Sequence, residues 1–305
     1  MALCRPKGLF LGADRAKFPE FKREILMKDV SGKIGFITGG ASGLGFAMAK
    51  TFLASGMRVA LTDIEDAAIE KTKAFFSDRV EDVLVMKTDV TDRDSMAAAR
   101  EQTLEKFGKV HVVCNNAGIA LNKNSADMTY KDWDWVLGVN LDGVVNGVTT
   151  FVGDIKSQGE GGHFVNTASI AGHHGMLGLS GYCASKFGVV GMSEAMRIDL
   201  AEDDIGISVL CPGPVATGIF NSERVRPEKF GGTEQAAYPI KEGARQSLEM
   251  ETLDPDLVGQ MVLNAVLENR FYIMTHSEFQ EWFKTRTDEI QDEYDYWKNF
   301  REKNG

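Results

Sequence analysis

A glycine-rich turn between a short apolar strand and a helix constrains the fold of this 305-residue chain more than any other feature. Residues 33–38 form a mostly apolar run that predicts a buried strand, and residues 46–53 have the apolar spacing of a helix that ends at Gly56. The glycines between them follow the spacing G-x-x-x-G-x-G. Such a turn lets backbone N–H groups and a helix N-terminus bind a pyrophosphate, although a single turn of this kind also fits an ordinary strand-to-helix connection.

A carboxylate ends the second predicted strand, residues 58–63, about 20 residues beyond the glycine turn. At this place Asp63 can accept hydrogen bonds from the ribose hydroxyls of an adenosine. Its charge repels a 2′-phosphate, and Ile64, Glu65 and Asp66 offer no arginine to hold one. These residues therefore predict NAD rather than NADP as the cofactor. The alternative is a solvated Asp63 that caps the following helix.

Strand and helix patterns alternate regularly between residues 33 and 274. Further strands are expected at residues 83–86, 110–114, 163–169, 207–211 and 272–274. This alternation predicts an α/β fold: a single domain with one doubly wound parallel sheet and helices on both faces. Polar residues follow two of the strands, at Asp89 and at residues 115–118, where a sheet of this type has its ligand crevice.

Tyr182 and Lys186 lie one helical turn apart in a segment with helical character. A phenol is a poor base at neutral pH, because its ordinary pKa is about 10. An ammonium on the same helix face stabilises the phenolate, which makes the tyrosine an acid/base group for an alcohol or a carbonyl. The pair alone has little specificity, since Tyr and Lys share a helix face by chance in many proteins.

Together these motifs resemble the short-chain dehydrogenase/reductase family, in its compact, NAD-dependent form with a Rossmann fold. The resemblance covers roughly residues 30–275, and the motifs keep the order and spacing of the family: Thr38-Gly39-x-x-x-Gly43-x-Gly45, Asp89, Asn115-Asn116-Ala117-Gly118, Asn140, Ser169, Tyr182-x-x-x-Lys186 and Pro212-Gly213. It implies an oxidoreductase that transfers a hydride between NAD and a CH–OH group.

The resemblance implies four catalytic residues. Tyr182 is expected as the general acid/base, and the hydroxyl of Ser169, thirteen residues earlier, as the group that hydrogen-bonds the substrate oxygen. Lys186 is expected to hold the nicotinamide ribose and to lower the pKa of Tyr182, which the positive charge of oxidised nicotinamide lowers further. Asn140 is expected to hold a water that relays protons to Lys186.

The resemblance also implies a set of cofactor-binding residues, and no metal ion. Within that set the Val215 backbone and the Thr217 hydroxyl are expected to hold the nicotinamide carboxamide. The full set is Gly39, Ser42, Gly43, Leu44, Gly45, Asp63, Ile64, Asp89, Val90, Asn116, Ala117, Gly118, Tyr182, Lys186, Pro212, Gly213, Val215 and Thr217.

The segment 218–254 has no regular period, and members of the family use this part of the chain as a loop that shapes the substrate pocket. A hydrophobic pocket for a bulky secondary alcohol or ketone is expected, because of the apolar residues Met176, Leu177, Leu179, Ile219, Phe220, Phe230 and Tyr238. Residues 134–147 and 272–274 resemble those of members that oxidise aryl secondary alcohols, such as lignin-derived dimers. Steroid and alicyclic alcohol dehydrogenases resemble the chain almost as much.

Three other functions stay open. A carbonyl reductase would use the same site in the opposite direction. A non-catalytic NAD-binding regulator is disfavoured because degenerate members usually lack the tyrosine or the lysine. An epimerase or dehydratase that uses NAD only transiently is disfavoured because those relatives have a longer C-terminal domain and another glycine spacing.

Composition excludes two further classes of partner. The net charge of −10 disfavours non-specific binding to nucleic acid. No apolar run approaches the ~20 residues that span a bilayer.

Four cysteines without ligand spacing are typical of reduced, mostly buried thiols, which predicts a cytoplasmic protein.

The ends of the chain extend beyond the predicted domain. Residues 1–30 are interpreted as an N-terminal extension, with Met27 as an alternative start, and residues 31–275 as the dinucleotide-binding and catalytic domain. Residues 276–305 predict a helical tail rich in aromatic and charged side chains, expected to pack on its own domain. The resemblance also implies a homodimer or homotetramer.

Overall fold

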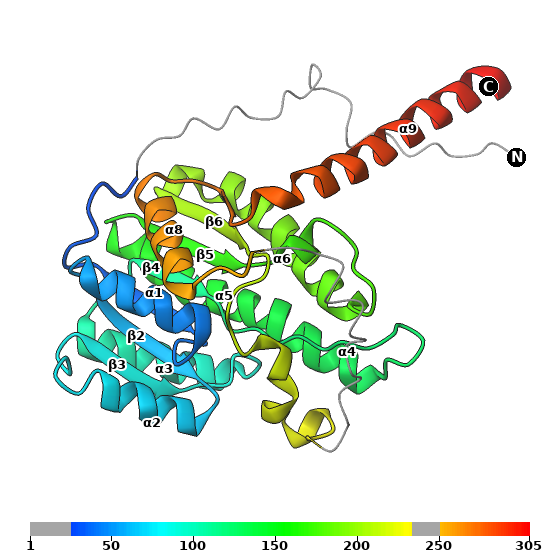
Figure 1. Ribbon diagram of the computed structural model, residues 1–305. Coiled ribbons are helices and arrows are strands. Elements are labelled where there is room, and N and C mark those ends of the chain that lie inside the picture. Colours follow the sequence, from blue (N-terminus) through cyan, green and yellow to red (C-terminus); the bar gives the residue numbers. More distant parts are fainter. Residues whose placement is uncertain (1–25, 234–250) are drawn as a thin grey trace, which may run out of the picture.

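The computed structural model describes residues 26–233 and 251–305, which form one seven-stranded parallel sheet with helices on both faces (Figure 1). The strand order is β3-β2-β1-β4-β5-β6-β7. The strands are β1 (Ile34–Thr38), β2 (Arg58–Asp63), β3 (Val83–Lys87), β4 (Val112–Asn115), β5 (Gly162–Thr167), β6 (Ile205–Cys211) and β7 (Tyr272–Met274). This doubly wound Rossmann arrangement confirms the predicted fold class.

The helices connect successive strands and cover both faces of the sheet. Their bounds are α1 (Gly43–Ala54), α2 (Asp66–Phe75), α3 (Arg93–Phe107), α4 (Tyr130–Leu137), α5 (Gly143–Gln158), α6 (Ser180–Asp199), α8 (Pro255–Leu267) and α9 (Gln280–Asn304). Because both faces are covered, β1 is buried at every position and reads as a continuous apolar run rather than an alternating one.

The core has two main layers, one on each face of the sheet. Ile37 packs in a cluster with side chains of α1 and α8. Its neighbour Phe36 points to the opposite face and packs with side chains of α3, α5 and α6, including Phe151 at a ring distance of 4.4 Å. Successive strand residues therefore face alternate layers, and the sheet is buried between them.

The strand order reverses between β1 and β4, and this switch point opens the crevice of the sheet. The hydroxyl oxygen of Thr38 accepts hydrogen bonds from the backbone N–H groups of Asn116 at 2.9 Å and Ala117 at 3.0 Å. The side-chain amide of Asn116 donates back to the Thr38 carbonyl at 3.0 Å. These bonds tie the ends of β1 and β4 together at the mouth of the crevice.

Several strand bounds differ by one or two residues from those predicted, and two differences concern the site. Strand β5 ends at Thr167, so Ser169 lies in the turn after the strand rather than within it. The helical stretch around Asn140 is interrupted by a π-helical turn, Gly138–Asp142, between α4 and α5. A π turn adds one residue to the helix and shifts the direction of the side chains that follow, a device common at functional sites.

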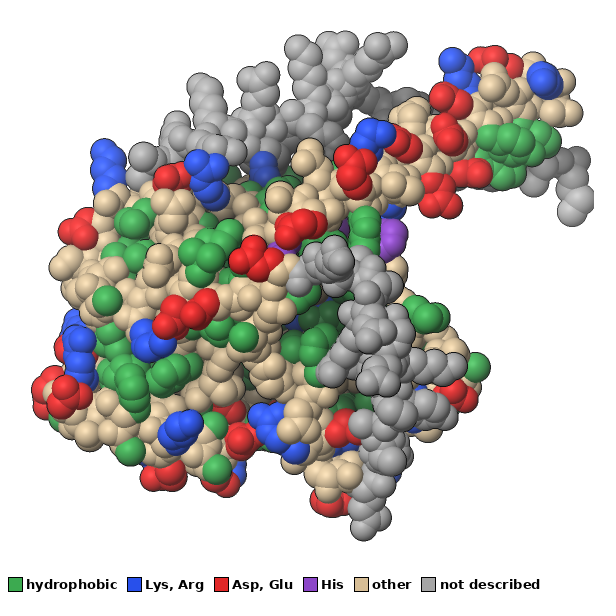
Figure 2. All heavy atoms as spheres, in the orientation of Figure 1, with side chains coloured by type: hydrophobic (Ala, Val, Ile, Leu, Met, Phe, Trp, Pro, Cys, Tyr) green, Lys and Arg blue, Asp and Glu red, His purple; other side chains and the backbone are tan. Residues whose placement is uncertain are grey.

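Helix α9 leaves the body of the molecule after its first turns (Figure 1). Near its start, Trp282 packs on His174 with ring centroids 5.2 Å apart, and the Arg286 guanidinium lies over the Phe187 ring at 5.2 Å. No residue of α9 is buried, and hydrophobic side chains are exposed near its far end (Figure 2). The expected packing of the tail on its own domain is therefore limited to its first turns.

One helical stretch among the described residues, Tyr130–Gln158, is long and apolar enough to cross a membrane by length and composition. It consists of α4, the π turn and α5, and 44% of its most apolar window is buried inside the protein. A helix that is buried in a protein core can meet the same criteria of length and apolar composition. Here Phe151 and Ile155 of this stretch belong to the layer that packs on the sheet.

Candidate functional site

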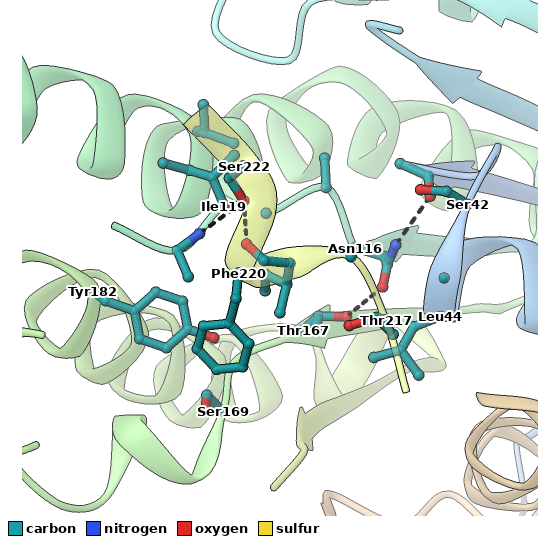
Figure 3. Close-up of a pocket in the computed structure, with 18 of the residues that line it drawn as sticks. Ser42, Leu44, Asn116, Ile119, Thr167, Ser169, Tyr182, Thr217, Phe220 and Ser222 are labelled. Atoms are coloured by element: carbon teal, nitrogen blue, oxygen red, sulfur yellow. Dashed lines mark hydrogen bonds between the residues drawn. The ribbon is translucent and has the colours of Figure 1, made fainter. Parts of the chain in front are cut away.

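A cavity of about 370 Å³ lies at the carboxyl ends of the strands, at the switch point between β1 and β4. All the predicted catalytic and cofactor-binding residues line it except Gly45 and Asn140, which are buried. The structure thus brings together residues that are spread over most of the chain. Figure 3 shows Ser42, Leu44 and Thr217 at one part of this cavity, and Tyr182, Ser169 and Phe220 at another.

The glycine turn has the close packing that a dinucleotide-binding loop requires. Gly39 has a positive φ of 61°, a conformation that side chains disfavour. A Cβ on Gly45 would lie 2.2 Å from the Gly39 carbonyl oxygen, so only glycine lets α1 begin so close to the turn. Ser42, the N-cap of α1, makes no capping hydrogen bond through its side chain. The turn and the helix N-terminus therefore fit the pyrophosphate of a dinucleotide.

Asp63 lines the cavity at the end of β2, and its carboxylate accepts backbone hydrogen bonds on both sides. Oδ2 accepts from the N–H of Ala41 in the glycine turn at 3.2 Å, and Oδ1 accepts from Ile64 at 2.8 Å. Burial raises the pKa of Asp63, and the backbone hydrogen bonds oppose this effect. Glu65, not Asp63, is the N-cap of α2. Asp63 is therefore not the N-cap of α2 and is partly buried rather than solvated, although its Oδ1 also accepts from the Glu65 N–H at 3.1 Å, at the start of that helix.

Tyr182 and Lys186 project from the first turns of α6 into the same part of the cavity. The Lys186 ammonium lies 5.6 Å from the centroid of the Tyr182 ring and donates to the Thr167 carbonyl at 2.8 Å. Burial lowers the pKa of Lys186 to about 8. Burial also raises the pKa of Tyr182 to about 12, although the hydrogen bond with Ser169 acts in the opposite direction.

Ser169 is held in the turn that follows β5. Its hydroxyl donates to the Pro212 carbonyl at 3.4 Å and accepts from the Ala171 N–H at 3.1 Å. The Ile170 N–H also donates to the Pro212 carbonyl, at 3.0 Å. The turns after β5 and β6 are thus joined, which places the Ser169 hydroxyl beside the Tyr182 hydroxyl (Figure 3).

Asn140 is buried in the π turn and faces the backbone at Ile119 rather than the open cavity. Its Oδ1 accepts from the Ile119 N–H at 2.8 Å, and its Nδ2 donates to the Ile119 carbonyl at 3.0 Å and to the Ser185 hydroxyl at 3.2 Å. A Cβ on Gly118 would lie 3.4 Å from the Asn140 amide oxygen and 3.6 Å from the Lys186 ammonium. Asn140, Gly118 and Lys186 are therefore close neighbours.

The segment after β6 covers the glycine turn. A Cβ on Gly43 would lie 3.2 Å from the Thr217 methyl, so Thr217 is in near contact with the turn. The Thr217 N–H donates to the Val215 carbonyl at 2.7 Å, and Val215 forms a parallel bridge with Leu253. Val215 and Thr217 both line the cavity, between Ser169 and the glycine turn.

The apolar end of the cavity agrees only in part with the expected pocket. Of the expected residues, Met176, Leu179, Ile219, Phe220 and Phe230 line the cavity. Leu177 is 92% exposed and does not line it, and Tyr238 lies outside the described residues. The structure adds apolar residues that the sequence pattern did not single out, among them Ile119, Ala120, Trp135, Val139 and Phe279.

Comparisons with known proteins agree with this geometry. The sequence profile described as "short chain dehydrogenase" matches residues 33–228. A "CLA biosynthesis dehydrogenase/reductase" of Lactiplantibacillus plantarum is 35% identical over 87% of this chain and 95% of its own length. A "C alpha-dehydrogenase" of a Sphingobium species is 32% identical over 84% of each chain.

A solved structure also resembles this fold closely. It is a short-chain dehydrogenase/reductase from Burkholderia phymatum in complex with NAD, with a TM-score of 0.82 and 34% identity over 88% of this chain and 97% of that one. The glycine turn, the switch-point cavity and the profile match therefore lead to one conclusion. The chain belongs to the short-chain dehydrogenase/reductase family and resembles its Cα-dehydrogenase members.

Proposed function

We propose that this protein is an NAD-dependent dehydrogenase that oxidises a bulky hydrophobic secondary alcohol to its ketone. The observation that supports this most is the position of Tyr182, Ser169 and Lys186, between an apolar pocket and the glycine turn of one continuous cavity. A bound NAD supplies the acceptor for the hydride. The chain's own residues bind and orient the reactants and move the proton.

In this proposal Tyr182 takes the proton from the substrate hydroxyl, and Ser169 donates a hydrogen bond to the substrate oxygen. The pKa of about 12 for Tyr182 means that the protein alone keeps the phenol protonated at neutral pH. A positive charge beside the ring is needed to lower that pKa. The Lys186 ammonium lies 5.6 Å from the centroid of the Tyr182 ring and supplies part of this positive charge. Asn140 positions the backbone near Lys186.

The preference for NAD over NADP rests on Asp63. Its carboxylate lies at the end of β2 beside the glycine turn, where a ribose hydroxyl can donate to it and a 2′-phosphate is repelled. The Arg224 guanidinium also lies at this end of the cavity, but it is paired with Glu65 at 2.9 Å. The resemblance to a structure that holds NAD supports the same choice.

The substrate class rests on the apolar pocket and on the relatives. The pocket is walled by side chains such as Trp135, Phe220 and Phe230, which suits a bulky apolar group beside the reacting carbon. The "C alpha-dehydrogenase" relative supports alcohol oxidation, and the "dehydrogenase/reductase" relative leaves ketone reduction as the alternative direction. A regulator that binds NAD without turnover is the alternative of another class.

The test is the rate of NADH formation by the purified chain. NAD or NADP is supplied with aryl, steroid and alicyclic secondary alcohols, and with small polar alcohols as the matched control. We expect turnover with NAD and a bulky apolar alcohol. Bound NADH without turnover of any alcohol or ketone would instead support the regulator.

We also propose that the protein is a cytoplasmic homo-oligomer. The thiols of Cys114, Cys183 and Cys211 are free and buried, as expected in a reducing compartment. The exposed hydrophobic side chains of α9, including Ile290, support burial against another subunit. Sedimentation analysis of the purified chain tests this, and a monomer at micromolar concentration would contradict it.

A further inference from the structure

The segment of residues 219–230, here called the strap, crosses both halves of the cavity. It consists of two short 3-10 helices, Ile219–Val225 and Glu228–Phe230. Ile219 and Phe220 line the cavity with Tyr182, while Arg224 lines it with Asp63 and Glu65 at the nucleotide end. A segment expected only to shape the substrate pocket thus also borders the part of the cavity that suits the adenosine.

Two cations of the strap form ion pairs with carboxylates at the nucleotide end. The Arg224 guanidinium lies 2.9 Å from Glu65, which follows β2. The Lys229 ammonium lies 2.9 Å from Asp89, which follows β3, and also donates to the Thr91 hydroxyl at 2.9 Å. Both cations are more than two-fifths exposed, so water and salt weaken these pairs.

A third cation of the strap is buried. The Arg226 guanidinium pairs with Asp132 at 2.7 Å, donates through Nε to the Phe230 carbonyl at 2.9 Å and lies 4.8 Å from the Trp135 ring centroid. The side chains of Arg226 and Asp132 are almost fully buried. Breaking this pair would leave the buried Arg226 guanidinium without its carboxylate, although Asp132 would keep its second partner, Lys123, at 2.7 Å. The pair therefore fixes the strap on α4 more firmly than the two exposed pairs do.

We propose that the strap is a latch on the bound dinucleotide, with the Arg226–Asp132 pair as its fixed anchor. Arg224 and Lys229 act as positioning residues that hold its free side over the nucleotide end through Glu65 and Asp89. NADH leaves only when these two exposed pairs open, so the pairs slow cofactor release. This inference rests on the proposed function, because it takes the cavity as a dinucleotide site.

The test is the rate of NADH release, measured by stopped-flow fluorescence after mixing the NADH complex with excess NAD. The Arg224→Gln/Lys229→Gln variant removes both exposed pairs and leaves the buried anchor. Since each pair stabilises the closed strap only modestly, we expect release about three- to tenfold faster than in the wild type. Release by the wild type should also accelerate with added salt, and that dependence should be weaker in the variant.

The matched control is Lys73→Gln/Lys87→Gln, which removes the same charge from two exposed ion pairs, with Glu70 and Asp66, outside the cavity. It should release NADH at the wild-type rate. Equal release rates in both double variants would overturn the latch alone. A wild-type chain that binds no NADH would overturn the proposed function, and the latch with it.

Discussion

Replacing Lys186 by Met should stabilise the folded chain while it removes activity, because the proposed site holds a charge that folding disfavours. The pKa of Lys186 falls from its ordinary 10.5 to about 8 through burial. At about 1.4 kcal/mol per pH unit, burial of the ammonium then costs about 3 kcal/mol at neutral pH. Met keeps most of the side-chain volume and carries no charge.

The gain in stability of Lys186→Met is smaller than the cost of burying the ammonium, because the variant also loses the hydrogen bond to the Thr167 carbonyl at 2.8 Å. A buried carbonyl without its partner destabilises the protein by about 1–2 kcal/mol. We therefore expect Lys186→Met to raise the free energy of unfolding by about 1–2 kcal/mol at pH 7, and the melting temperature by roughly 3 °C.

The stability difference between Lys186→Met and the wild type should decrease as the pH rises. The folded pKa of Lys186 lies below its unfolded value, so between pH 8 and 10.5 the unfolded chain binds more protons than the folded one. Wild-type stability therefore rises with pH across this window through Lys186, and the advantage of the Met variant shrinks.

The assay is thermal unfolding of both chains at about pH 7 and about pH 9.5, with the exposed Lys71→Met as control. A Lys186→Met chain that melts below the wild type at neutral pH would refute the reasoning. The reasoning would also be refuted if the melting temperature of Lys186→Met exceeded that of the wild type by the same amount at both pH values.

Two further variants test the proposed cofactor-binding half of the site. Asp63→Ala should weaken the preference for NAD over NADP about tenfold or more, because it removes a charge-assisted hydrogen bond and a repulsive carboxylate. The ratio of kcat/KM for the two cofactors measures this, with Asp66→Ala as control, and an unchanged ratio would remove Asp63 from the ribose site. Gly45→Ala should destabilise the chain by about 1–3 kcal/mol, because the added Cβ meets the Gly39 carbonyl at 2.2 Å. A Cβ on Gly191 would meet nothing within 4 Å, so Gly191→Ala should not be destabilising. Equal melting temperatures for Gly45→Ala and Gly191→Ala would contradict the close packing of the glycine turn.

The fold could be predicted from the sequence because buried parallel strands carry their signal locally. Residues 58–63 were expected as a strand and match β2. The boundary of the fifth strand was less accurate: it was placed at Ser169, although β5 ends at Thr167. Short apolar residues in the following turn, such as Ala168, continue the strand pattern and hide its end.

The residues that line the glycine-turn half of the cavity could also be predicted, because glycine turns and polar strand ends have fixed places in this sheet. The π turn at Asn140 could not, since no residue pattern in Gly138–Asp142 distinguishes it from a regular helix. The ion pairs of the strap could not either. Lys229 and Asp89 are 140 residues apart, and only the folded chain brings them together.

The central claim is tested most directly by a comparison of the wild type with Tyr182→Phe, which removes one hydroxyl and keeps the ring. NADH binding and NADH formation from NAD and a bulky secondary alcohol are measured for both chains at mildly alkaline pH. We predict that both chains bind NADH with similar affinity and that only the wild type turns over. Turnover by Tyr182→Phe near the wild-type rate would contradict the assignment of Tyr182 as the acid/base group.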